Sequence, residues 1–240
     1  MKPNLIFMCK TTKKVVTEYQ LIIHGSESLL DYVWYASYGS NLFEDRFHCY
    51  INGGTPEGSA YAEVGCTDKA LPLKAATISM PYELYFSKYS KRWHGGVAFI
   101  DIVKNPSART YGKMYLITSD QFQEIVQQEN GDHDMKIDLA LAKEVHTYSF
   151  NESWYGNILY LGERDGCPIF TFTANEEMKE QAITPPSIPY LRNLYRGLWP
   201  LHQDREKIID YLSSKKGVKE IYSKEDLYEH FPEIIKNRTY

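Results

Sequence analysis

Apolar residues along the chain fall into short runs separated by polar turns, and the clearest run covers residues 31–37. Its Val, Trp and Tyr side chains are typical of a buried β-strand. The sequence Gly39-Ser40-Asn41 then offers the backbone conformations that end a strand. Apolar residues with early acids in residues 42–47 predict a helix after this turn. Such a junction directs several unpaired backbone N–H groups at one spot, which suits a carboxylate, a phosphate or a developing oxyanion.

Further strands and helices follow through the rest of the chain. Apolar and β-branched runs predict strands within residues 72–86, 97–100, 111–117, 143–150, 157–161 and 167–173, with a hairpin joining the last two. Capping residues and apolar spacing predict helices from Thr118 or Ser119 to Asn130-Gly131, across residues 190–198 and 204–212, and from Ser223 onward with an interruption near Pro232. Residues 52–61 form a predicted loop.

The two ends of the chain are predicted to be additions to a central domain. Residues 1–30 contain two apolar runs that lean towards strands, and we expect an extension that adds a hairpin to the main sheet. Residues 31–212 form the predicted central domain, and residues 213–240 form a predicted helical tail. No internal repeat or low-complexity tract is present in the sequence.

Composition excludes several classes of function. The 240 residues are 43% hydrophobic and 24% charged, which is ordinary for a globular protein. A net charge of −4 and a pI near 6.0 predict no binding of nucleic acid or of an anionic membrane. No apolar run is long enough for a membrane helix, and the start of the chain has too short a core for a signal peptide, so we expect a cytoplasmic protein. The four cysteines lack metal-like spacing and are expected to be free thiols.

Four separated motifs resemble those of the γ-glutamylcyclotransferase family. Residues 38–42 read Tyr-Gly-Ser-Asn-Leu, which is similar to the family's YGSNL signature, and residues 93–96 resemble its W-H-G-G segment. Gln128-Glu129 is similar to the family's Q-E-G tripeptide, with Asn130 inserted before the glycine. Residues 185–190 resemble a P-P-S-x-x-Y segment that leads into a helix ending in glycine, followed by a G-L-P-L-like turn. The resemblance covers about residues 32–212 and implies a compact α+β fold, a small mixed β-barrel with surrounding helices.

The resemblance also implies the site residues. It implies that Glu129 is the general base, and that Tyr190 contacts the substrate through its hydroxyl group. It further implies that a substrate-binding loop is formed by Tyr38, Gly39, Ser40, Asn41 and Leu42. Without the resemblance, a glutamate at the end of a helix is typical of a solvated surface group. Glu124 is a weaker candidate for the base.

The implied reaction is the release of 5-oxoproline from a γ-glutamyl compound by intramolecular attack of its α-amine. Because the substrate carries both nucleophile and electrophile, the resemblance implies no metal and no cofactor. Two alternatives stay open: an enzyme of the same fold acting on another γ-glutamyl compound, such as a γ-glutamylamine or an acyl-chain intermediate, and a non-catalytic ligand-binding or interaction protein. The sequence distinguishes no particular γ-glutamyl substrate and predicts no oligomeric state.

Two other groups of residues are predicted to be structural. His94 lies beside glycines, where a lone histidine is more often a packing residue, and we assign it no catalytic role. Asp132-His133-Asp134 is a short run that cannot easily converge on one metal ion, so a solvated loop is predicted.

Overall fold

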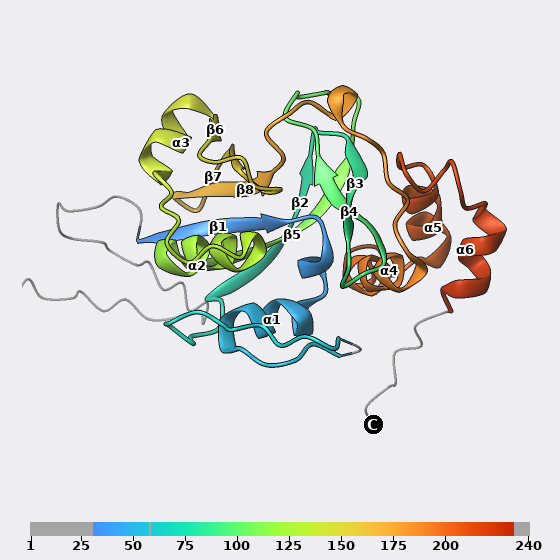
Figure 1. Cartoon of the computed structure of the whole chain (residues 1–240), viewed down its shortest axis with the longest axis horizontal. Helices are drawn as coiled ribbons and strands as arrows, with labels where there is room; N and C mark the ends of the chain where they lie inside the picture. The colour runs from blue at the N-terminus through green and yellow to red at the C-terminus, as the bar shows by residue number, and fades with distance from the viewer. Residues whose placement is uncertain (1–30, 58, 233–240) are drawn as a thin grey trace, which may run out of the picture.

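A computed structural model describes residues 31–57 and 59–232 of the chain. The predicted hairpin of residues 1–30 and the end of the predicted tail lie outside the described residues. The described chain combines β-sheets with six α-helices, as expected for the α+β class (Figure 1).

The main sheet has six strands in the order β2-β5-β1-β8-β7-β6. Its central strand, β1, pairs antiparallel with β5 and parallel with β8. The strand bounds are β1 Tyr32–Ser37, β2 Lys74–Met80, β5 Thr110–Thr118, β6 Thr147–Ser149, β7 Asn157–Arg164 and β8 Cys167–Thr173. Strands β3 (Leu84–Ser90) and β4 (Gly95–Ile100) form a separate two-stranded sheet. The predicted strand at residues 31–37 and the hairpin near residue 165 are confirmed.

The expected closed barrel is not found among the described strands. The six-stranded sheet is open, with β2 and β6 at its two edges. β4 approaches β8 through a side chain instead of a backbone ladder. The Thr173 hydroxyl donates to the Ile100 carbonyl oxygen at 2.6 Å, and its oxygen accepts from the Ile100 N–H at 3.2 Å. Because this link uses a side chain, it holds the two sheets together without closing them into a barrel.

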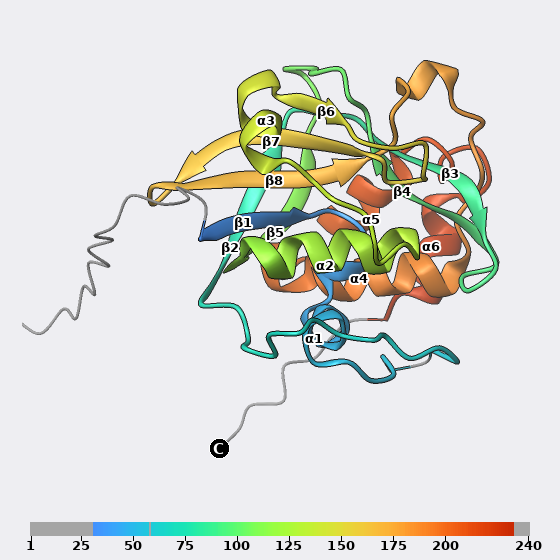
Figure 2. The ribbon, with the colours of Figure 1, turned by 60° about the vertical axis from the view of Figure 1, so that its left-hand side comes forward.

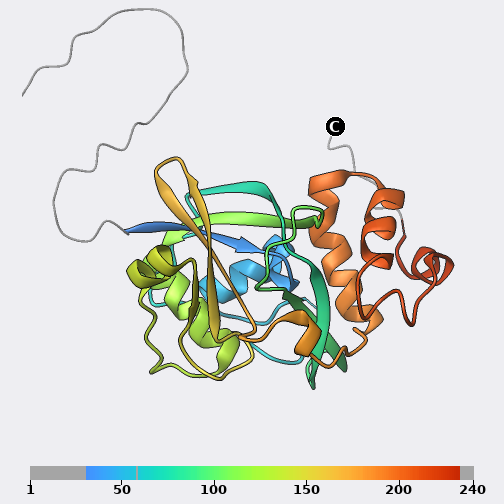
Figure 3. The ribbon, with the colours of Figure 1, turned by 90° about the horizontal axis from the view of Figure 1, so that it is seen from above.

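Both faces of β1 are buried, each in a different hydrophobic core. Val33 and Tyr35 face the core built with α1 (Glu44–Asn52), α2 (Ser119–Asn130) and α3 (Leu139–Val145). Trp34 and Ala36 face the core built with β3, β4, α4 (Ile188–His202), α5 (Arg205–Ser213) and α6 (Lys224–His230). Figure 2 shows α2 running alongside β1, and Figure 3 shows α4, α5 and α6 gathered at one end of the molecule. The end of β1 therefore lies between two cores that fix its position.

The strand predicted for residues 143–150 is largely wrong. α3 extends to Val145, and only Thr147–Ser149 form a strand. The Asp138 side chain caps α3 by accepting from the Leu141 N–H at 2.9 Å, and the helix buries Leu139 and Ala142 on one face. Burial at helical spacing outweighs the alternating pattern of the sequence.

The helix predicted across residues 190–198 is longer than expected. α4 continues through Gly197 and Pro200 to His202, and Gln203 ends it with a φ of 50°. Gly197 serves close packing instead: a Cβ atom there would lie 2.5 Å from the carbonyl carbon of Leu42. The glycine therefore lets α4 press against the turn that follows β1.

The segment after residue 212, as far as the structure describes it, packs into the core that contains α4 and α5. Val218, Leu227 and Phe231 are buried in the same core as α4 and α5. Ser223 caps α6 with a capping box, as the sequence predicts. Cys49, Cys66 and Cys167 are free thiols. None of the helices in the described residues combines the length and the apolar character needed to cross a membrane.

Candidate active site

The turn after β1 is held in place by α4. Residues Ser40–Leu42 form one turn of 3-10 helix, which the Leu42 N–H closes on the Gly39 carbonyl oxygen at 3.0 Å. Asn193 of α4 donates from its side chain to the Ser40 carbonyl oxygen at 2.8 Å. Together with the close approach of Gly197, this contact fixes the backbone of the turn.

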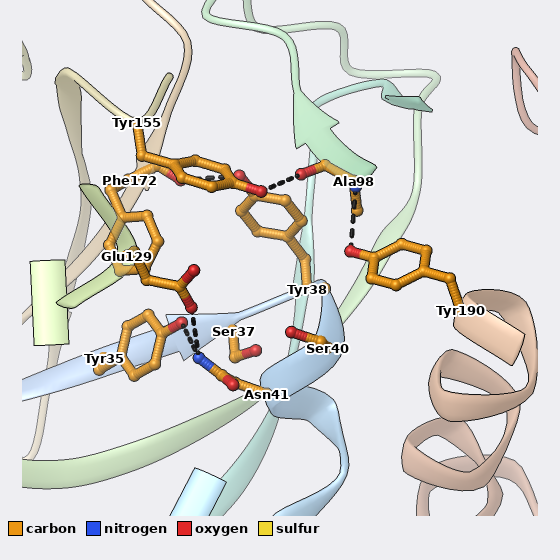
Figure 4. A pocket seen from close by; sticks show the side chains of 11 residues that line it. Tyr35, Ser37, Tyr38, Ser40, Asn41, Ala98, Glu129, Tyr155, Phe172 and Tyr190 are labelled. Atoms are coloured by element: carbon orange, nitrogen blue, oxygen red, sulfur yellow. Dashed lines mark hydrogen bonds between the residues drawn. The ribbon is translucent and has the colours of Figure 1, made fainter. Parts of the chain in front are cut away.

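A cavity opens beside this turn (Figure 4). It is lined by Tyr35, Ser37, Tyr38, Gly39, Ser40, Asn41, Ala98, Glu129, Tyr155, Phe172 and Tyr190. The structure thus brings together six of the predicted site residues: Tyr38, Gly39, Ser40, Asn41, Glu129 and Tyr190. Leu42 is the exception, because its side chain is only 2% exposed and packs in the core instead of lining the cavity.

Glu129 reaches the cavity from the last turn of α2. The Asn41 side-chain amide donates to Glu129 Oε1 at 3.1 Å and lies 3.3 Å from the Tyr35 hydroxyl oxygen, to which it also donates. α2 begins with a capping box at Thr118 and ends with Gly131 in the left-handed conformation, as predicted. Glu129 is thus partly buried and hydrogen-bonded to the turn, unlike a fully solvated surface glutamate.

Asn130, the residue inserted before Gly131, has structural partners of its own. Its side-chain amide donates to the carbonyl oxygens of Val126 at 3.0 Å and Tyr155 at 3.3 Å. Its side-chain oxygen accepts from the Tyr155 N–H at 3.1 Å. The insertion thus ties the end of α2 to the loop that carries Tyr155, which also lines the cavity.

The environment raises the pKa of Glu129 above its usual range. Burial is the largest cause, because it penalises the charged carboxylate. The positive charge of Arg46 and hydrogen bonds from Tyr50 and Asn41 lower the pKa in part, while the negative charge of Glu63 raises it. A carboxylate with a raised pKa is a better proton acceptor than an ordinary surface glutamate.

Three tyrosine hydroxyl groups are fixed around the cavity by backbone groups (Figure 4). The Tyr190 oxygen accepts from the Ala98 N–H at 3.0 Å, and Tyr155 donates to the Ala98 carbonyl oxygen at 3.2 Å. Tyr38 donates to the Phe172 carbonyl oxygen at 2.7 Å. Burial raises the pKa of all three hydroxyl groups, so they are neutral at physiological pH. Glu129 is the one carboxylate among the described lining residues.

Two polar atoms of the lining residues are buried without a hydrogen-bond partner in the described chain. They are the Ser37 hydroxyl oxygen and the Asn41 side-chain oxygen. Buried polar groups are normally paired, because leaving one unpaired costs about 1–3 kcal/mol. A hydroxyl group and an amide oxygen beside a carboxylate suit a small ligand that offers both an acceptor and a cationic donor.

The other candidates from the sequence lie away from this cavity. Glu124 accepts from the N–H and the hydroxyl of Thr67, at 2.7 and 2.6 Å. His94 is exposed on a turn with a φ of 53°. Residues 132–134 are exposed in a loop. In the part of the chain that the structure describes, no group of three His, Cys, Asp or Glu side chains could hold a metal ion.

Sequence reasoning missed five of the lining residues: Tyr35, Ser37, Ala98, Tyr155 and Phe172. A signal existed for Ser37, because it is a polar residue at the end of an otherwise apolar strand. Tyr155 and Phe172 reach the cavity only through the tertiary fold, and no local pattern marks them.

No family model matches the chain. Among curated proteins, one named "Histone deacetylase 5" from Arabidopsis thaliana is 40% identical over 183 residues, which cover 69% of this chain. The matched part is 28% of the length of that protein. This chain is therefore similar to a part of a much longer protein.

Three solved structures resemble the fold at low sequence identity. A protein titled γ-glutamyl cyclotransferase has a TM-score of 0.46 at 16% identity, over 82% of this chain and 98% of its own. An uncharacterized human protein has a TM-score of 0.47 at 17% identity, over 83% and 99%. A yeast γ-glutamyl cyclotransferase specific to glutathione has a TM-score of 0.30 at 15% identity, over 79% and 96%.

Proposed function

We propose that the protein is an enzyme of the γ-glutamylcyclotransferase type, which releases 5-oxoproline and a free amine or amino acid from a γ-glutamyl compound. One observation carries this proposal: the Glu129 carboxylate lies 3.1 Å from the side-chain nitrogen of Asn41, although 88 positions separate the two residues in the sequence. The residue resembling the family's base and the turn resembling its substrate loop thus meet at one cavity.

The cavity offers complementary groups for the two reacting parts of a γ-glutamyl substrate. Glu129, the unpaired oxygen of Asn41 and the Tyr35 hydroxyl suit the α-ammonium group. The backbone N–H groups of residues 39–41 and the unpaired Ser37 hydroxyl suit the γ-carbonyl oxygen. Donors fixed in advance towards a developing negative charge contribute about 3–4 kcal/mol to lowering the barrier.

The proposed reaction is an intramolecular acyl transfer. Glu129 takes a proton from the α-ammonium group, and the freed amine attacks the γ-carbonyl carbon to form the five-membered ring. The bond between that carbon and the leaving nitrogen breaks, and the protonated Glu129 returns its proton to the departing nitrogen. The attacking nitrogen also loses a second proton, which ends on the departing amine. The products are 5-oxoproline and the amine as its ammonium ion, with no covalent enzyme intermediate.

The test is direct measurement of 5-oxoproline release from a panel of γ-glutamyl amino acids, γ-glutamylamines and glutathione. Release from at least one member supports the reaction class, and the preferred member names the leaving group that the enzyme accepts. Binding of these compounds to folded protein with no release would contradict the proposal and would support the alternative of a ligand-binding protein of the same fold.

A further inference from the structure

A buried cluster of charged side chains lies next to the cavity without lining it. Arg46 of α1 is only 3% exposed, and its guanidinium donates to the Tyr50 hydroxyl at 3.4 Å and to Glu63 at 3.2 Å. Glu63 is 8% exposed and accepts a second guanidinium, that of Arg92, at 2.5 Å. The cluster consists of Arg46, Tyr50, Glu63 and Arg92.

The cluster holds more positive charge than its ion pairs require. Two guanidinium groups share the single Glu63 carboxylate, which leaves one positive charge without a counterion inside the cluster. The Arg46 Nε atom is also buried without a hydrogen-bond partner in the described residues. The Arg92 side chain is 26% exposed, so Arg46, at 3% exposure, is the buried cation of the cluster. A buried cation is costly unless negative groups lie nearby. A second negative group close to Arg46 would therefore offset part of this cost.

The contacts between α1 and α2 bring this surplus charge beside Glu129. Gln128, the neighbour of Glu129, donates to the Tyr50 carbonyl oxygen at 3.1 Å. The Tyr50 hydroxyl accepts from Arg46 at 3.4 Å, and both side chains lower the pKa of the Glu129 carboxyl. The titratable and charged groups that act on Glu129 come from several elements. Arg46 of α1 is the positive group and Glu63 of the following loop is the negative group. The others are tyrosines: Tyr35 of β1, Tyr50 of α1, Tyr155 of the loop before β7 and Tyr190 of α4. Arg92 acts on Tyr50.

We infer that Arg46 is a positioning residue, which keeps Glu129 ionised through the charged cluster beside the end of α2, and that Glu63 opposes it by neutralising part of its charge. This inference rests on the proposed function for its role in the reaction, but the charge coupling itself exists in the protein without substrate. The balance between Arg46 and Glu63 then sets the lowest pH at which Glu129 is a carboxylate.

The coupling predicts opposite effects of two substitutions on the pH profile of kcat/KM. Arg46→Met removes a positive charge, so the pKa of Glu129 rises. The acid limb of the profile, where kcat/KM falls as the pH falls, therefore moves to higher pH. At a pH on that limb, we expect kcat/KM to be about tenfold or more below that of wild type. Glu63→Gln removes a negative charge, so the acid limb moves to lower pH. Arg46→Lys keeps the charge and should leave the limb close to that of wild type.

These variants separate charge coupling from loss of structure. In Arg46→Met the apolar stem is retained, and Glu63 keeps its pair with Arg92. A merely structural role would lower activity at every pH without moving the acid limb. An unmoved limb in Arg46→Met, or shifts of the same sign in Arg46→Met and Glu63→Gln, would overturn the inference.

A second measurement is independent of activity. The pH titration of the Glu129 side-chain carboxyl is followed by carbon-13 NMR, with its resonance identified by its loss in Glu129→Gln. We expect the titration to move to higher pH in Arg46→Met and to lower pH in Glu63→Gln. Unchanged titration would overturn the coupling even if the enzyme is active, and shifted titration in a protein without turnover would contradict the proposed function alone.

Discussion

Asn41 connects the turn after β1 to the proposed base. Its side-chain nitrogen donates to both Glu129 and Tyr35, while its side-chain oxygen is buried without a hydrogen-bond partner in the described residues. The sequence places Asn41 and Glu129 in one site only through the family resemblance, because neither residue has a local signal of its own. Leu42 shows the reverse: it belongs to the same motif, yet its side chain packs in the core.

The hydroxyl group of Tyr190 is expected to matter for both stability and activity. In Tyr190→Phe the buried Ala98 N–H loses its acceptor, so the free energy of unfolding should fall by about 1–3 kcal/mol. Loss of a substrate contact at the same position should lower kcat/KM by roughly tenfold. Urea denaturation and steady-state kinetics measure the two effects.

Tyr85→Phe is the matched control for this variant. The Tyr85 hydroxyl is buried without a hydrogen-bond partner in the described chain, so its removal should leave stability unchanged or raise it. Equal destabilisation by both substitutions would show that the contact between Tyr190 and Ala98 is not the cause.

Among the elements, α2 and the turn after β1 were predictable because their signals are local. Thr118, Gln121 and Gly131 specify the bounds of α2 through capping. α3 and the continuation of α4 through Pro200 were not predictable, because burial against other elements decides them. The cluster around Arg46 was missed because Glu63 and Arg92 come from a loop and a turn that only the tertiary fold brings to α1. A signal was present in Tyr50, which lies four positions after Arg46 on the same helix.

Asn130 is expected to fix the position of the loop that carries Tyr155 relative to the end of α2. Asn130→Ala removes the hydrogen bonds to both backbone groups of Tyr155, so the free energy of unfolding should fall by about 1–2 kcal/mol. Because Tyr155 lines the cavity next to Glu129, kcat/KM should fall by roughly tenfold or more. Asn130→Asp keeps the acceptor for the Tyr155 N–H and should lie between wild type and Asn130→Ala. Full activity of Asn130→Ala would mean that Asn130 does not help to orient the residues around the cavity.

At the scale of the whole molecule, the two cores meet at β1, and the site lies where that strand ends. The last described residues belong to one of these cores. Phe231 is buried and stacks on Tyr195 with ring centroids 5.0 Å apart, and the Tyr195 hydroxyl donates to the Pro232 carbonyl oxygen at 2.8 Å. Because α4 carries both Tyr195 and Tyr190, packing at the end of the chain supports the helix that clamps the turn.

Phe231→Ala should therefore destabilise the whole fold. Truncation of a buried phenylalanine costs about 3–5 kcal/mol, measured as a lower free energy of unfolding in a single cooperative transition. Phe231→Leu retains most of the volume and should cost less than about 1.5 kcal/mol. If both variants unfolded at the wild-type denaturant concentration, the segment after residue 212 would be an appendage to the fold.

The central claim is that Glu129 acts as the base, and Glu129→Gln tests it most directly. The amide keeps the shape of the side chain but cannot accept the proton, so 5-oxoproline release should fall by about 10²- to 10⁴-fold. Substrate binding, measured by calorimetry, should persist. Glu124→Gln changes a carboxylate of the same helix that bonds Thr67 away from the cavity, and its turnover should match wild type. Wild-type turnover by Glu129→Gln would contradict the account.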